Sequence, residues 1–159
     1  MARDVTQFIP RKLAQAVLDQ LATITEANGY QTQPLVTMDV RQADGQTGVQ
    51  HTLFVAPTGL TPTITGSPHR WEGDVTIAIV AQTRPGKEDP TDLNLALLQD
   101  VLNVLTGETA MLALATAAGQ GVVLGIGNVE IDEPWMTLED GLAGWTLMVT
   151  FGMVQTPPW

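Results

Sequence analysis

The residues best suited to catalysis are Ser67 and His69, which lie in a Gly-Ser-Pro-His sequence and invite a nucleophile-and-base interpretation. A serine nucleophile needs a sharp strand-to-helix turn and backbone donors for the oxyanion. This sequence lacks the second glycine of that turn, and Pro68 removes a backbone N–H. We therefore expect a loop turn here and no catalytic residues in the chain.

The candidates for metal binding are two histidines and a group of acids. Neither His51 nor His69 has another histidine at the i, i+4 spacing of a helical zinc site. A metal would have to recruit carboxylates such as Glu130 and Asp132, which share a strand face, with Glu133 beside them. A solvated strand face explains these acids more simply, so we expect no metal site and no cofactor.

The absence of cysteine and the acidic balance remove further classes of function. Because the chain has no Cys, disulfides, thiolate metal sites and cysteine nucleophiles are excluded. The glycine pairs at 119–121 and 125–127 do not have the spacing of a dinucleotide-binding loop. The formal net charge of −10 is the opposite of a nucleic-acid-binding footprint. Specific DNA binding is therefore disfavoured, whereas passage of DNA past the protein is not.

Length and composition predict one globular domain. A chain of 159 residues buries enough surface for one core, and we expect a single domain over 1–159 with a flexible tail at 155–159. No segment has the length of a signal-peptide core or of a membrane span, so no membrane partner is expected. Charged residues make up 15% of the chain, against about 25% in average proteins. This low charge density favours contact with other proteins, or else reflects the composition of the source genome.

Two amphipathic helices are predicted, because apolar residues recur at three- and four-residue steps. The first covers 7–28, where Pro10 suits the first turn. The second covers 91–106, because Asp89 and Pro90 can cap and start it. Its apolar stripe consists of Leu93, Leu97, Val101 and Leu105.

An antiparallel hairpin is predicted around Asp44-Gly45, a dipeptide that tolerates the positive φ angles of a tight turn. Its strands would cover 35–41 and 49–55, with the alternation of a half-buried pair. Pairing about this turn places Val36, Met38 and Val40 opposite Leu53, His51 and Val49, respectively.

The middle of the chain is predicted to supply the central strand. Residues 57–70 are rich in Pro, Gly and Thr and indicate a long loop or a weak two-stranded excursion. The alternation at 72–82 is the clearest strand in the chain, and the Pro- and Gly-containing segment 85–90 ends it. Both irregular segments are candidates for ordering against a partner.

The last third of the chain contributes two further strands. Residues 108–118 are compatible with a short third helix, and 122–131 predicts a strand with a bulge at its two glycines. The final strand places Trp145, Leu147, Val149, Phe151 and Met153 on one face and Thr146, Met148 and Thr150 on the other. The predicted fold class is α/β of the α+β type, an antiparallel-dominated mixed sheet with two main helices packed on one face.

The four tryptophans are the residues best suited to anchor a large partner, because aromatic side chains recur at interface hot spots. We expect Trp71 and Trp145, on strands of regular alternation, to lie in the core. We expect Trp135 and Trp159 to contact a neighbouring subunit or a partner. The candidate interface residues are Trp135, Met136, Trp159, Leu60, Ile64 and Pro85.

Two stretches of sequence carry a family resemblance. Arg70-Trp71-Glu72-Gly73-Asp74-Val75, followed by a Pro-containing loop, begins a Trp-led strand before a helix. Glu139-Asp140-Gly141-Leu142 opens the last strand, which continues through Trp145 and Val149-Thr150-Phe151. In this order of elements the chain resembles the tail terminator proteins of long-tailed bacteriophages, of the lambda-like type. The order agrees over most of the chain, whereas 57–70 and 108–127 have no clear counterpart in that family.

The resemblance implies a structural virion protein at the head–tail junction, assembled in the cytoplasm of a bacterial host. Such a protein forms a homo-oligomeric ring, a hexamer, that caps the tail tube, stops its polymerisation and joins it to a neck or connector protein of the head. DNA passes through the ring without specific binding, and acidic residues at the channel would repel its phosphates. The candidate channel-facing acids are Asp39, Asp44, Glu72, Asp74, Glu88 and Asp89.

Three other interpretations are compatible with the sequence. A head-side stopper or adaptor protein of the neck would account for the two stretches without a counterpart. A tail tube-like protein would share the ring geometry. A small hydrolase or metal-dependent enzyme would be built on Ser67, His51 or His69. An enzyme would be found free in solution, whereas a terminator would be found at the head–tail junction.

Overall fold

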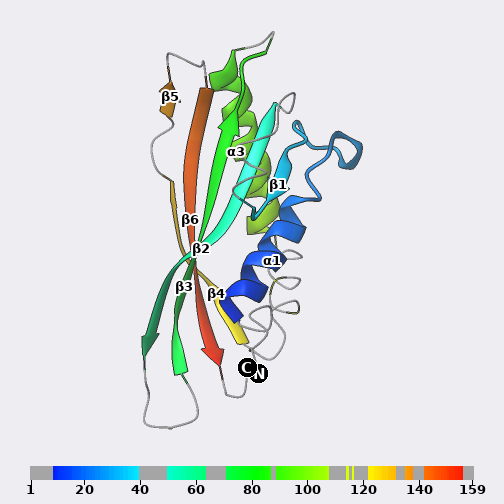
Figure 1. The fold of residues 1–159 in the computed structure, drawn as a ribbon. Helices are drawn as coiled ribbons and strands as arrows, with labels where there is room; N and C mark the ends of the chain where they lie inside the picture. The colour runs from blue at the N-terminus through cyan, green and yellow to red at the C-terminus, as the bar shows by residue number, and fades with distance from the viewer. Residues whose placement is uncertain are drawn as a thin grey trace.

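A six-stranded mixed sheet carries both long helices on one of its faces (Figure 1). The strand order across the sheet is β1-β2-β3-β6-β4, and β5 also pairs with β6. Among the described strands, β1 and β2 run parallel and the other pairs are antiparallel, which confirms the predicted fold class. The structure is a computed structural model that describes residues 9–39, 50–63, 71–86, 89–107, 114, 116, 122–131, 135–137 and 142–155.

The first helix, α1 (Ile9–Leu21), ends earlier than the predicted 7–28. After it, the Thr23 hydroxyl donates to the carbonyl three residues earlier, and the side-chain amide of Asn28 donates to the carbonyl of Thr23. These side-chain hydrogen bonds compete with the helical ladder and end it. A single 3-10 turn, η2 (Glu26–Asn28), follows before the chain turns towards the sheet.

The second long helix, α3 (Pro90–Thr106), agrees with the predicted 91–106. The Asp89 carboxylate accepts the N–H of Thr91 at 2.9 Å, so the predicted cap is confirmed. The predicted buried stripe is partly wrong, because Leu93 is only half-buried whereas Asn94 and Asp100 are buried. The helix turns Asn94 and Asp100 towards the interior of the protein, where both side chains find hydrogen-bond partners.

The predicted hairpin is wrong, because β1 (Leu35–Thr37) and β2 (His51–Thr63) pair in parallel. Val36 does lie opposite Leu53, but His51 pairs with Thr83 of the next strand. Before β1, Thr32 donates its N–H and its hydroxyl to Oδ2 of Asp100 in α3, at 2.9 and 2.7 Å. After β1, the N–H of Asp39 donates to the Thr37 hydroxyl at 2.9 Å, a local turn that ends the strand. These contacts fix the chain on both sides of β1.

β2 and β3 (Trp71–Thr83) form a long antiparallel pair. Residues 57–63, predicted as a loop or weak two-stranded excursion, belong to β2, while 64–70 lie outside the described residues. The register shifts between Pro57 and Gly59. Because β1 pairs only with the start of β2, the rest of β2 is an edge among the described strands, and prolines are tolerated at an edge.

β3 is the predicted central strand, lying between β2 and β6 (Leu142–Gln155). β6 pairs along the whole of β3 without a register shift. On the other side of β6 lies β4 (Val122–Ile131), whose register shifts twice around its glycines, as the predicted bulge requires. The short β5 (Trp135–Thr137) pairs with the start of β6.

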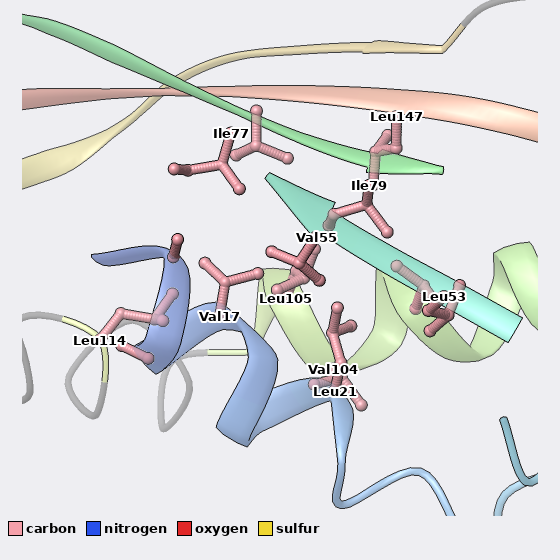
Figure 2. Packing of buried hydrophobic residues seen from close by; sticks show 14 of the residues in the cluster. Val17, Leu21, Leu53, Val55, Ile77, Ile79, Val104, Leu105, Leu114 and Leu147 are labelled. Carbon is pink, nitrogen blue, oxygen red and sulfur yellow. The ribbon is translucent and has the colours of Figure 1, made fainter. Parts of the chain in front are cut away.

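The core lies between the helices and the sheet, where Figure 2 shows side chains of α1, α3, β2 and β3 converging. Trp145 and Phe151 of β6 are among its largest fully buried side chains, which confirms the predicted inner face of β6 from Trp145 to Phe151. Of the predicted helix 108–118, only Leu114 and Thr116 are described; both are helical, and Leu114 is buried in the core.

Candidate functional site

A buried polar cluster lies where β2 begins, β3 ends and α3 crosses the sheet. Nδ1 of His51 is 3.0 Å from the hydroxyl of Thr83, and this hydroxyl donates to the side-chain carbonyl of Asn94 at 2.8 Å. The indole N–H of Trp145 donates to the backbone carbonyl of Asn94 at 3.0 Å. His51 is 6% exposed, and its three neighbours are more deeply buried. The cluster therefore joins two strands of the sheet to α3 and to β6.

The direction of these hydrogen bonds argues against a nucleophile at Thr83. Because the single hydroxyl proton is given to Asn94, Thr83 accepts from His51, and Nδ1 of the imidazole carries a proton. A general base would instead have to accept the proton of the nucleophile. Burial also closes the pair to any substrate. The histidine–threonine pair is therefore a structural hydrogen bond.

Burial lowers the pKa of His51 below its usual value of 6.5, and the nearby Asp100 carboxylate opposes part of this decrease. Asp100 is held in place by the two hydrogen bonds from Thr32. The imidazole is therefore neutral near pH 7, with its Nδ1 proton shared with Thr83.

Of the residues considered for metal or acid–base chemistry, the structure describes only His51 and Glu130, and these two do not lie together. Among the described residues, no three His, Asp or Glu side chains are close enough to hold a metal ion. Glu130 belongs to β4, in register with Met148, whereas His51 begins β2 opposite Thr83, on the other side of β3 and β6. Ser67, His69, Asp132 and Glu133 lie outside the described residues.

The face of the sheet opposite the helices is covered by no described helix (Figure 1). Its side chains alternate with those of the core. Most are half-buried, and the central residues that β2, β3 and β6 contribute carry no charge. We call this surface the open sheet face, and its central residues are Thr52, Phe54, Ala56, Thr76, Ala78, Val80, Thr146, Met148 and Thr150. Glu72 and Asp74 share the face at the start of β3, so the described charge on it is acidic.

The acids predicted to face a channel lie at different places in the fold. Glu72 and Asp74 are near the start of β3, whereas Asp89 caps α3 beyond the end of that strand. Asp39 follows β1 at the edge of the sheet. Asp44 and Glu88 lie outside the described residues.

The predicted interface residues are also separated. Leu60 is 41% exposed on the edge strand β2, and Pro85 is exposed in the loop after β3. Trp135 and Met136 belong to β5. Ile64 and Trp159 lie outside the described residues, as does residue 44 of the predicted turn.

Sequence reasoning missed Thr83, Asn94 and Asp100 as members of one cluster. The available signal was Asn94, which lies three residues before Leu97 and seven before Val101, at a position of the apolar stripe. A polar residue at such a position predicts a buried hydrogen-bond partner. Its partner could not be named, because Thr83 precedes the helix on a different element.

Fold and site together define a two-layer α+β domain with an open sheet face and a buried, inaccessible histidine. Comparison with protein-family models and with curated proteins gave no match for this chain. In the part of the chain that the structure describes, no helix has the length and apolarity needed to cross a membrane.

Proposed function

We propose that the protein is a structural virion protein of the tail terminator type. It forms a ring at the head–tail junction, caps the tail tube, stops its polymerisation and joins it to a neck protein. The proposal is carried by the open sheet face, which is uncharged across three strands and acidic at one end in a chain of net charge −10. Such a surface suits contact with protein rather than with a charged small substrate.

The resemblance in order of elements supports the ring, and the charge supports the passage of DNA. Several copies of a chain with net charge −10 around a channel would repel the phosphate backbone and leave few sites that retain it. His51, on which the enzymatic alternative relies, is 6% exposed and is therefore not an accessible base. Asp39 and Asp89, one on a sheet edge and one at a helix start, are proposed to face the channel from different levels.

The test is to mix the purified protein with tail tubes that lack a cap. A terminator arrests tube growth and is found by electron microscopy at the tube end that meets the head. Unchanged tube growth would favour a head-side stopper or adaptor. Growth of filaments from the protein alone would assign it to the tube proteins, because these stack on themselves without limit.

A further inference from the structure

The outer side of α1 carries its charges in an order that is unfavourable for the helix itself. Arg11 and Lys12 lie in its first turns, and the exposed Asp19 lies near its end. A helix has a partial positive charge at its N-terminus and a partial negative charge at its C-terminus, so acids are preferred first and bases last. α1 has no acid in its first turn and no base in its last. Arg11 donates to Oε1 of Gln15 one turn later, at 3.3 Å. The helix dipole gives no reason for cations at this end of α1, so they are available to a partner of opposite charge.

The open sheet face offers the opposite charge at the same end of the molecule. Asp74 is exposed on this face near the start of β3, and Glu72 shares the face. β3 begins at the end of the molecule where α1 also begins (Figure 1). Two copies placed side by side with their strands in the same direction would bring Asp74 of one next to Lys12 of the other.

Away from these charges the two surfaces are mainly uncharged, and the exposed acids on the helix layer are Asp19 of α1 and Asp92 of α3. The middle of the open sheet face presents Phe54, Val80 and Met148, each half-buried. Next to α1, the outer side of α3 exposes Leu95 (43%) with Gln99 and Asn103. Copies of a chain with net charge −10 repel each other, so they approach most easily through uncharged surfaces.

We propose that neighbouring copies contact each other through two different surfaces: the outer layer of α1 and α3 on one copy packs on the open sheet face of the next. Arg11 and Lys12 then lie beside Asp74, which is thereby assigned to the subunit contact and not to the channel. The contact is heterologous, and a heterologous contact generates a ring when the rotation between successive copies closes on itself. This inference rests on the proposed ring function and identifies its contact surfaces.

The size of the open sheet face fits a contact that is weak in isolation. Three strands of 13, 13 and 14 residues cover roughly 600 Å² at the usual strand spacing, below the about 800 Å² per partner of a standard interface. A single contact of this size would not hold a stable dimer. In a closed ring each copy makes two contacts, and closure adds no further loss of translational freedom.

Charge reversal tests the contact. One variant carries Arg11→Glu and Lys12→Glu, and a second carries Asp74→Lys. At concentrations where the wild type forms rings, each variant alone should associate at least about tenfold more weakly by sedimentation velocity, because like charges then face each other. Glu26→Lys is the matched control for Asp74→Lys: it makes the same change of charge at an exposed site beyond the other end of α1, and association should be unchanged.

An equimolar mixture of the two reversed variants should restore the ring, because copies that alternate around it again present opposite charges at every contact. Circular dichroism shows whether each variant is folded. If the first variant does not fold, Lys12→Gln replaces it; if the second does not fold, Asp74→Asn replaces it. Rings that tolerate both reversals, or a mixture no better than its components, would overturn this contact while leaving the ring function intact. A wild type that never associates, even on tail tubes, would overturn both proposals.

Discussion

His51 links solvent pH to stability, because its pKa in the folded protein lies below the value of 6.5 expected in the unfolded chain. The unfolded chain therefore binds a proton more readily, and the free energy of unfolding decreases as pH falls through about 6.5 towards the lower folded value. Urea unfolding between about pH 8 and pH 5 should show this decrease. His51→Gln should remove the share of the slope that this imidazole contributes. Equal slopes in wild type and His51→Gln would contradict a neutral, buried imidazole.

Asn94 is the acceptor on which the buried cluster depends. Asn94→Ala leaves the Thr83 hydroxyl without its acceptor and should lower the free energy of unfolding by about 1–3 kcal/mol. Asn103→Ala, at an exposed position of the same helix, should change it by no more than about 0.5 kcal/mol. Chemical denaturation measures both variants. Comparable losses at the two positions would show that the hydrogen bond to Thr83 contributes nothing specific.

Among the elements, α3 starts at a cap whose hydrogen bond and charge can be separated. Asp89→Ala removes the acceptor for the Thr91 N–H and should cost about 1 kcal/mol of unfolding free energy. Asp89→Asn keeps a cap of similar strength without the negative charge. Thermal unfolding compares the two variants, with Asp92→Asn as a control for charge near the helix start. If Asp89→Asn loses as much stability as Asp89→Ala, the carboxylate charge and not the cap is responsible.

The edge strand β2 is protected by prolines, since none of its residues is charged. Pro57 and Pro62 lie opposite Ile77 and Gly73, an even number of residues apart on β3, so both have the same orientation in the ladder. We expect both proline nitrogens to face outward. Because proline has no backbone N–H, an incoming strand would then find two hydrogen-bond donors missing. Replacing both by Thr should increase self-association in light scattering, whereas Pro85→Thr, outside the strands, should not. Unchanged scattering would indicate that the proline nitrogens face β3 and do not protect the edge.

Elements whose signals are local could be predicted from the sequence. The cap at Asp89 and the alternation around Ile77 identify α3 and β3 correctly. The direction of β1 could not be predicted, because it depends on a hydrogen bond between Thr32 and Asp100, which lie 68 residues apart. The edge segment 57–63 has the composition of a loop because an edge strand tolerates proline. The open sheet face follows from alternation, whereas the His51 cluster needs partners from distant elements.

For the whole molecule, we expect association that depends on concentration. The core is large enough for a stable monomer, and the open sheet face is too small for a stable dimer, so dilute protein should be monomeric. At high concentration or on the tail tube it should form a closed ring. Sedimentation equilibrium over a range of concentrations measures this transition. A stable dimer with two-fold symmetry, in solution and in the particle, would contradict it.

The central ladder has a consequence for how the protein folds during synthesis. β3 pairs with β6 along its whole length, from Trp71 opposite Gln155 to Thr83 opposite Ala143. A central strand of the sheet can therefore be completed only after the last strand has been synthesised. Strand pairs between such distant segments form slowly, and an unpaired strand is prone to aggregation in the meantime. One side of β3 therefore stays without its partner until residues 142–155 have left the ribosome. For the proposed ring, this order of synthesis predicts that only finished chains present a complete sheet to a neighbouring copy.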